Sequence, residues 1–112
     1  MSFALPSVAV SAVPADGFVL DVRESDEWAA GHVEGALHVP MSEFTTRLEE
    51  VTDAADGRTA YVMCRVGGRS AQVTQFLVRQ GVEAVNIDGG MLAWDAAGRP
   101  MVTDTDSPAF VL

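Results

Sequence analysis

The sequence has a single cysteine and no lysine. A single cysteine excludes an intramolecular disulfide, and with only two, widely separated histidines it gives no recognisable zinc-binding spacing. We therefore expect apolar packing to hold the fold together, because hydrophobic residues make up 48% of the chain. No metal and no cofactor are expected, and a lone cysteine fits a reducing compartment.

The sequence also lacks segments with the composition of a targeting signal or a membrane span. The N-terminus has no basic region of the kind that opens a secretory signal peptide. No window approaches the roughly 18 apolar residues that a membrane span needs. The net charge of −9 opposes binding to nucleic acid and to anionic membranes. We expect a cytoplasmic protein whose partners include neither nucleic acid nor membranes.

No repeat, low-complexity tract or linker divides the 112 residues, so we expect one domain over 1–112. Its core should span about 4–98, with a C-terminal extension at 99–112 that is either packed or loose. Short apolar runs alternate with helical patterns along the core. Strands are expected at 7–10, 17–22, 36–39, 59–63 and 84–87, and helices at 24–30, 41–51, 70–80 and from 89–90 through 94.

This alternation predicts an α/β fold with an open, mostly parallel five-stranded sheet and helices on both faces. Gly31 is expected to follow the end of the first helix as its C′ residue. Ser42 is expected to be the N-cap of the second helix. Gly89 and Gly90 are expected to let the chain turn close to the segment that follows the fourth strand.

Cys64 follows the fourth expected strand directly and precedes a helix, and ligands bind at the carboxyl ends of strands in such sheets. The segment that it begins reads CRVGGRS, and its two glycines allow backbone N–H groups to curve around one point. The start of the helix adds further free N–H groups, while Arg65 and Arg69 add positive charge. These surroundings stabilise a thiolate, so we expect a lowered pKa for Cys64 and nucleophilic catalysis without a histidine base.

A second interpretation of Cys64 is an inert residue of the core, because free cysteines are among the most buried residue types. A core position does not require two glycines and two arginines within the next five residues. The sequence therefore favours a reactive thiol.

The segment CRVGGRS resembles the active-site loop Cys-Arg-x-Gly-x-Arg-Ser of single-domain rhodaneses. Two further segments, DVRESDEWAAGHVEGALHVP and IDGGMLAW, resemble other rhodanese signatures, and the likeness covers about residues 4–98. It implies a thiosulfate:cyanide sulfurtransferase-like enzyme that works by double displacement. Cys64 would take sulfur from a donor as a persulfide and pass it to an acceptor. The loop that would cradle this sulfur consists of Arg65, Val66, Gly67, Gly68, Arg69 and Ser70.

The resemblance also implies the partners and the supporting residues. The donor would be a small anion, thiosulfate or a thiol persulfide, and the acceptor a thiol, cyanide or a protein sulfur carrier. Asp21 and Arg23 would support the loop, with Asp21 orienting it through Arg69; an ordinary surface pair is the alternative.

One departure from the family bears on the donor. Two-domain thiosulfate enzymes of the family carry basic residues near the loop and after the Asp-x-Arg segment, where they hold thiosulfate. This sequence has Val66 at the first place and the acidic residues Asp26 and Glu27 around the second. We therefore expect a high KM for thiosulfate.

Two other functions stay open. A rhodanese-fold binding or regulatory module would have no turnover, although family members of that kind typically lack the cysteine. Cysteine phosphatases and arsenate reductases place five residues between cysteine and arginine, whereas residues 65–68 give four here. The shorter loop suits a sulfur atom better than a tetrahedral oxyanion.

The two histidines are expected to have structural roles. His32 is expected to bond the backbone rather than act as a base, and His38 is expected to pack.

Overall fold

A computed structural model describes residues 5–112, so Ala4, where the core was expected to begin, lies outside the described residues. Five strands form one sheet in the order β1-β5-β4-β2-β3, and every neighbouring pair is parallel. The strands are β1 (Ser7–Val8), β2 (Phe18–Asp21), β3 (Leu37–His38), β4 (Ala60–Met63) and β5 (Ala84–Ile87). The helices are α1 (Ser25–Ala30), α2 (Leu48–Ala55), α3 (Gly68–Arg79) and α4 (Gly90–Ala96), with 3-10 turns at Val10–Ala12 and Met41–Glu43.

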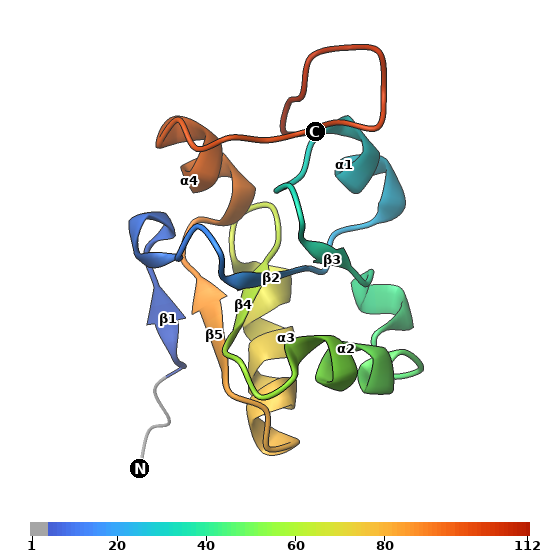
Figure 1. Ribbon diagram of the computed structural model, residues 1–112, viewed down its shortest axis with the longest axis vertical. Helices are drawn as coiled ribbons and strands as arrows, with labels where there is room; N and C mark the ends of the chain where they lie inside the picture. Colours follow the sequence, from blue (N-terminus) through green and yellow to red (C-terminus); the bar gives the residue numbers. More distant parts are fainter. Residues whose placement is uncertain (1–4) are drawn as a thin grey trace.

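The expected open parallel sheet with helices on both faces is confirmed, and two buried clusters define its layers (Figure 1). One cluster joins the sheet to α2 and α3 through residues such as Val51 and Leu77. The other joins it to α4 through Met91 and to the turn at Val10–Ala12. Successive strand residues face opposite sides, and Cys64, directly after β4, belongs to the cluster on the α3 side.

The expected helix over 41–51 is wrong in its first half, and Ser42 is not an N-cap. A 3-10 turn occupies Met41–Glu43, and α2 begins only at Leu48. Thr46 donates its hydroxyl hydrogen to the Glu43 carbonyl at 2.9 Å, an alternative to the helical ladder that threonine side chains commonly offer. Ser42 instead donates to the Glu24 carboxylate at 3.0 Å, which ties this turn to the segment before α1.

Gly31 does not have the left-handed conformation expected of a C′ residue, since its φ of 177° is extended backbone. Glycine is required at this position for a different reason. A Cβ atom at Gly31 would lie 2.5 Å from the Phe110 carbonyl oxygen, closer than real contacts allow. The Phe110 N–H donates to the Ala30 carbonyl at 3.1 Å, and His32 and Val102 form a two-bond bridge. The segment 99–112 is therefore a packed extension that runs from α4 across α1 (Figure 1).

α2 ends at Ala55, beyond the expected 51. The remaining element boundaries lie within two residues of the predicted ones: β5 coincides with the expected 84–87, and α3 begins at Gly68 instead of Ser70. Among the helices of residues 5–112, none is both long and apolar enough to cross a membrane.

Candidate active site

Cys64 lies directly after β4, and its sulfur is held at the start of α3. The Gly67 N–H donates to Sγ at 3.0 Å, and the Ser70 hydroxyl lies 3.2 Å from the same atom. Gly67 has a φ of 116°, a left-handed conformation that only glycine adopts readily. This conformation turns its N–H back toward the sulfur, so the short loop and the first turn of α3 surround one atom with donors.

Cys64 is 1% exposed, so the thiol is enclosed as well as hydrogen-bonded. Burial opposes the charged form and by itself raises the pKa of the thiol. The Ser70 hydroxyl and the N–H groups of Ser70, Gly67 and Val66 act in the opposite direction and together outweigh burial. The net pKa of Cys64 is lowered from the ordinary value of 9.0, as the sequence predicted.

The N-terminus of α4 holds the backbone at the start of the loop. The Met91 N–H donates to the Cys64 carbonyl at 2.9 Å, and the Leu92 N–H donates to the Arg65 carbonyl at 3.1 Å. Gly90 makes this approach possible, because a Cβ atom there would collide with the Cys64 and Arg65 carbonyls. The expected role of the glycine pair, a close turn against the loop, is confirmed.

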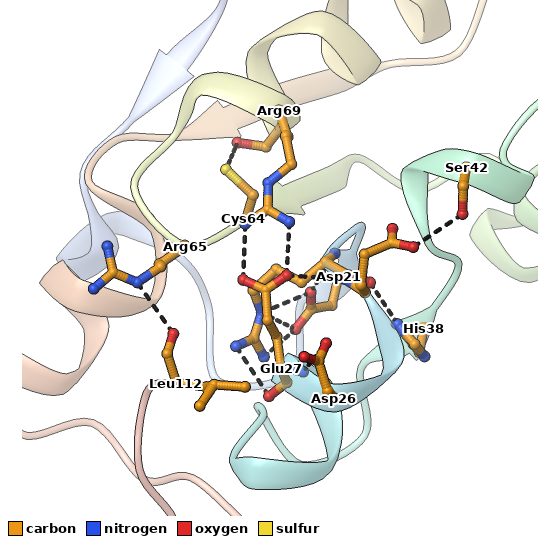
Figure 2. A network of polar contacts seen from close by, with 12 residues as sticks. Asp21, Asp26, Glu27, His38, Ser42, Cys64, Arg65, Arg69 and Leu112 are labelled. Carbon is orange, nitrogen blue, oxygen red and sulfur yellow. Dashed lines mark hydrogen bonds and ion pairs between the residues drawn. The ribbon is translucent and has the colours of Figure 1, made fainter.

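The two loop arginines are both engaged with other parts of the chain (Figure 2). The Arg69 guanidinium donates to both carboxylate oxygens of Glu27 in α1, at 2.7 and 2.8 Å. The Arg65 Nε–H donates to the Leu112 carbonyl at 3.1 Å. Arg69 is held primarily by Glu27, which raises its pKa, and a thiolate at Cys64 acts in the same direction. The charge of Arg69 is therefore largely matched by Glu27, whereas Arg65 is bound to a backbone carbonyl.

The expected contact between Asp21 and Arg69 is wrong. Asp21 ends β2 and forms a bidentate pair with Arg23, with Nη2–Oδ2 and Nε–Oδ1 distances of 2.7 and 3.0 Å. Both side chains are buried, so the pair is not an ordinary surface contact either. Arg23 also donates to the Gly31 carbonyl at 2.8 Å and to the Glu27 carbonyl at 3.3 Å. The pair thus fixes α1, the helix that carries the Glu27 carboxylate to Arg69.

Asn86 in β5 is a site residue that sequence reasoning missed. Its side chain is buried, accepts from the Ser70 hydroxyl at 2.5 Å and donates to the Gly67 carbonyl at 3.3 Å. A polar residue within the apolar strand AVNI was the available signal, because buried polar groups require partners.

The remaining predicted residues divide between the loop and its surroundings. Val66 is 54% exposed, and Gly68 has open space where a side chain would be. His32 bonds the Trp28 carbonyl at 2.7 Å through Nδ1, as expected of a structural histidine. His38 bonds the Arg23 carbonyl at 2.7 Å and stacks on Trp28, which confirms its packing role.

With this geometry established, similarity to known proteins identifies the class. The sequence profile of the rhodanese-like domain matches residues 9–97. The chain belongs to the rhodanese-like domain family, and its relatives include proteins named as sulfurtransferases. It is 37% identical over 84 residues to Bacillus subtilis YtwF, named for an expected sulfurtransferase activity, covering 74% of this chain and 78% of that protein. A sulfurtransferase of Allochromatium vinosum is 35% identical over 88 residues, covering 78% of this chain and 79% of that protein.

Solved structures agree in fold. A rhodanese-related protein of Thermoplasma volcanium superposes with a TM-score of 0.73 at 28% identity, over 87% of this chain and 97% of that one. A thiosulfate sulfurtransferase of Pseudomonas aeruginosa gives a TM-score of 0.77 at 28% identity, over 90% of this chain and 21% of that one.

Proposed function

We propose that this protein is a sulfurtransferase that carries sulfur as a persulfide on Cys64. The observation that carries the proposal is the enclosed Cys64 sulfur with donors from Gly67 and Ser70 and a lowered pKa. A thiolate is the reactive form of cysteine, and these donors shift the equilibrium toward it. Enclosure also suits the transfer of a single atom, because only a donor whose sulfur projects from its end can reach the buried thiol.

The reaction proceeds in two displacements. The Cys64 thiolate attacks the outer sulfur of the donor, a bond forms between Sγ and that sulfur, and the donor's S–S bond breaks. The electron pair leaves with sulfite when the donor is thiosulfate, or with a thiolate when the donor is a thiol persulfide. A nucleophilic acceptor then attacks the outer sulfur, and the electron pair of the Sγ–S bond returns to Cys64 as thiolate. Cyanide, a thiol or a protein sulfur carrier can be the acceptor.

We propose further that a thiol persulfide serves better than thiosulfate. Thiosulfate is a dianion, and the site needs an unmatched positive charge to hold it. The Arg69 guanidinium is instead bound through two hydrogen bonds to Glu27, and Val66 supplies no charge. The other loop cation, Arg65, is exposed to solvent, which screens its charge, and its Nε–H is bound to the Leu112 carbonyl. A persulfide carries at most one negative charge on its sulfur and depends less on such a cation.

Mass spectrometry after mixing with a sulfur donor tests the function. The protein should gain one sulfur atom on Cys64, lose it to cyanide with release of thiocyanate, and gain none when Cys64→Ser is used. A wild-type protein that never gains the sulfur would contradict sulfur transfer and favour a binding module. Hydrolysis of an aryl phosphate that requires Cys64 would favour a phosphatase.

A further inference from the structure

The Ser70 hydroxyl has two acceptors but only one hydrogen. Its oxygen lies 3.2 Å from the Cys64 sulfur and 2.5 Å from Oδ1 of Asn86, and all three side chains are buried. A hydroxyl can donate to one acceptor at a time. The direction of this single hydrogen therefore depends on which acceptor attracts it more strongly.

The charge on the Cys64 sulfur changes during the proposed reaction, on which this inference rests. Sγ is a thiolate before the first displacement, and an anion is the stronger acceptor. Once the persulfide forms, the charge resides on the outer sulfur and Sγ becomes a neutral, weak acceptor. The charge returns to Sγ when the acceptor removes the outer sulfur.

We propose that Asn86 is a positioning residue that holds the Ser70 hydroxyl hydrogen while the Cys64 sulfur is neutral and releases it when that sulfur is charged. Asn86 is suited to this role because its own orientation is fixed: its Nδ2 group donates to the Gly67 carbonyl, which directs Oδ1 toward Ser70. Hydrogen transfer between the two acceptors requires only rotation of the hydroxyl, with no change in covalent bonding.

Asn86 affects the pKa of Cys64 in the opposite direction to the hydrogen-bond donors around the sulfur. When Ser70 donates to the thiolate, the buried Oδ1 of Asn86 loses its partner, which disfavours the charged state. Asn86 therefore holds the pKa of Cys64 above the value that the loop would otherwise impose. It keeps the thiolate more nucleophilic, because nucleophilicity falls as the pKa of a thiol falls.

Replacement of Asn86 isolates the effect. In Asn86→Leu the hydroxyl has only the sulfur as an acceptor, so the pKa of Cys64 should fall by roughly half a unit to one unit, the equivalent of one neutral hydrogen bond. The Gly67 carbonyl keeps a donor in this variant, since it also accepts from the Ala71 N–H at 3.1 Å. The charged groups near the sulfur are unchanged: Arg65, Arg69 with Glu27, and the buried pair of Asp21 with Arg23.

The measurement is the pH dependence of iodoacetamide alkylation of Cys64, which does not require sulfur transfer. Asn86→Leu and Asn86→Ala should both lower the apparent pKa, while Ser70→Ala should raise it. In the Ser70→Ala background, Asn86→Leu should have no further effect, because Asn86 acts only through the hydroxyl. Cyanide should remove sulfur faster from loaded Asn86→Leu than from loaded wild type, since the departing thiolate is better stabilised.

The outcomes separate this role from a structural one. A loop that loses its order exposes the thiol and moves its pKa up toward the ordinary value, the opposite direction. A raised pKa in both Asn86 variants, or an equal shift with and without Ser70, would overturn the proposal. Failure of sulfur loading alone, with the predicted pKa shifts intact, would contradict the proposed function and leave the role of Asn86 standing.

Discussion

The Arg69 guanidinium and the Glu27 carboxylate, 42 residues apart in sequence, form a bidentate ion pair with N–O distances of 2.7 and 2.8 Å. Arg69 belongs to the first turn of α3, beside the thiol, and Glu27 to α1. The Glu27 side chain is 14% exposed and that of Arg69 is 34% exposed, so solvent screens the pair only in part. The charge of Arg69 is thereby matched before any substrate arrives.

Replacement of Glu27 should improve the use of thiosulfate. Glu27→Gln keeps an oxygen that can accept from Arg69 and from the Glu24 N–H, but it removes the compensating charge. An unmatched cation near a bound dianion contributes roughly 1 kcal/mol at a partly screened site, so the KM for thiosulfate should fall about fivefold. The KM for the persulfide of an uncharged thiol should change less. Steady-state kinetics with both donors is the measurement.

A matched control for this prediction is Glu50→Gln. Glu50 pairs with Arg47 next to α2, so the variant makes the same change in net charge without altering Arg69. An equal fall in KM for both variants would show that overall charge, and not the Glu27 carboxylate, limits thiosulfate binding.

The Glu27–Arg69 pair should also give the protein a defined acid sensitivity. The hydrogen bond from Arg69 lowers the pKa of Glu27 below its ordinary value of 4.5. The unfolded chain therefore binds this proton first as the pH falls, so the pair's contribution to stability is complete above about pH 4.5 and is lost below it. The melting temperature of wild type should exceed that of Glu27→Gln near neutral pH, and the difference should shrink as the pH falls through this range. A constant difference would mean that Glu27 does not titrate as a paired group.

The sheet and the position of Cys64 could be predicted because local patterns determine them. Apolar runs such as TAYVM require burial wherever they lie, and a cysteine between strand and helix falls at the carboxyl edge of a parallel sheet. The partner of Arg69 could not be found in this way. Asp21 and Glu27 are both acidic and lie six residues apart, and only the orientation of α1 decides which of them reaches the loop.

Asn86 and Gly31 illustrate two further limits of the sequence. Asn86 contacts Ser70 across the gap between β5 and the start of α3, a contact that no local spacing reports. Gly31 follows a helix, which favours the interpretation as a C′ residue, yet its role depends on the Phe110 backbone 79 residues later. Contacts between distant segments decide both positions.

The buried pair of Asp21 and Arg23 should be a major source of stability. Asp21→Asn removes one charge and leaves the fully buried Arg23 guanidinium uncompensated. Breaking such a pair from one side destabilises a protein by roughly 3–5 kcal/mol. Urea unfolding followed by circular dichroism should show this loss as a lower midpoint. Glu50→Gln, which breaks an exposed pair, should leave the midpoint nearly unchanged; equal midpoints for the two variants would contradict the prediction.

The close approach of the segment 99–112 to α1 depends on the absence of a side chain at Gly31. Its extended backbone suits alanine, so Gly31→Ala introduces no backbone strain but places a methyl group against the Phe110 carbonyl. The segment must move away, and the hydrogen bond from the Phe110 N–H to the Ala30 carbonyl should break. Hydrogen exchange of the Phe110 amide should then accelerate by about tenfold or more, the equivalent of losing one backbone hydrogen bond and its local packing.

Gly68→Ala is the control, because a methyl group at Gly68 meets open space and should leave Phe110 protected. Unchanged exchange in Gly31→Ala would mean that the segment does not rest on α1 in solution.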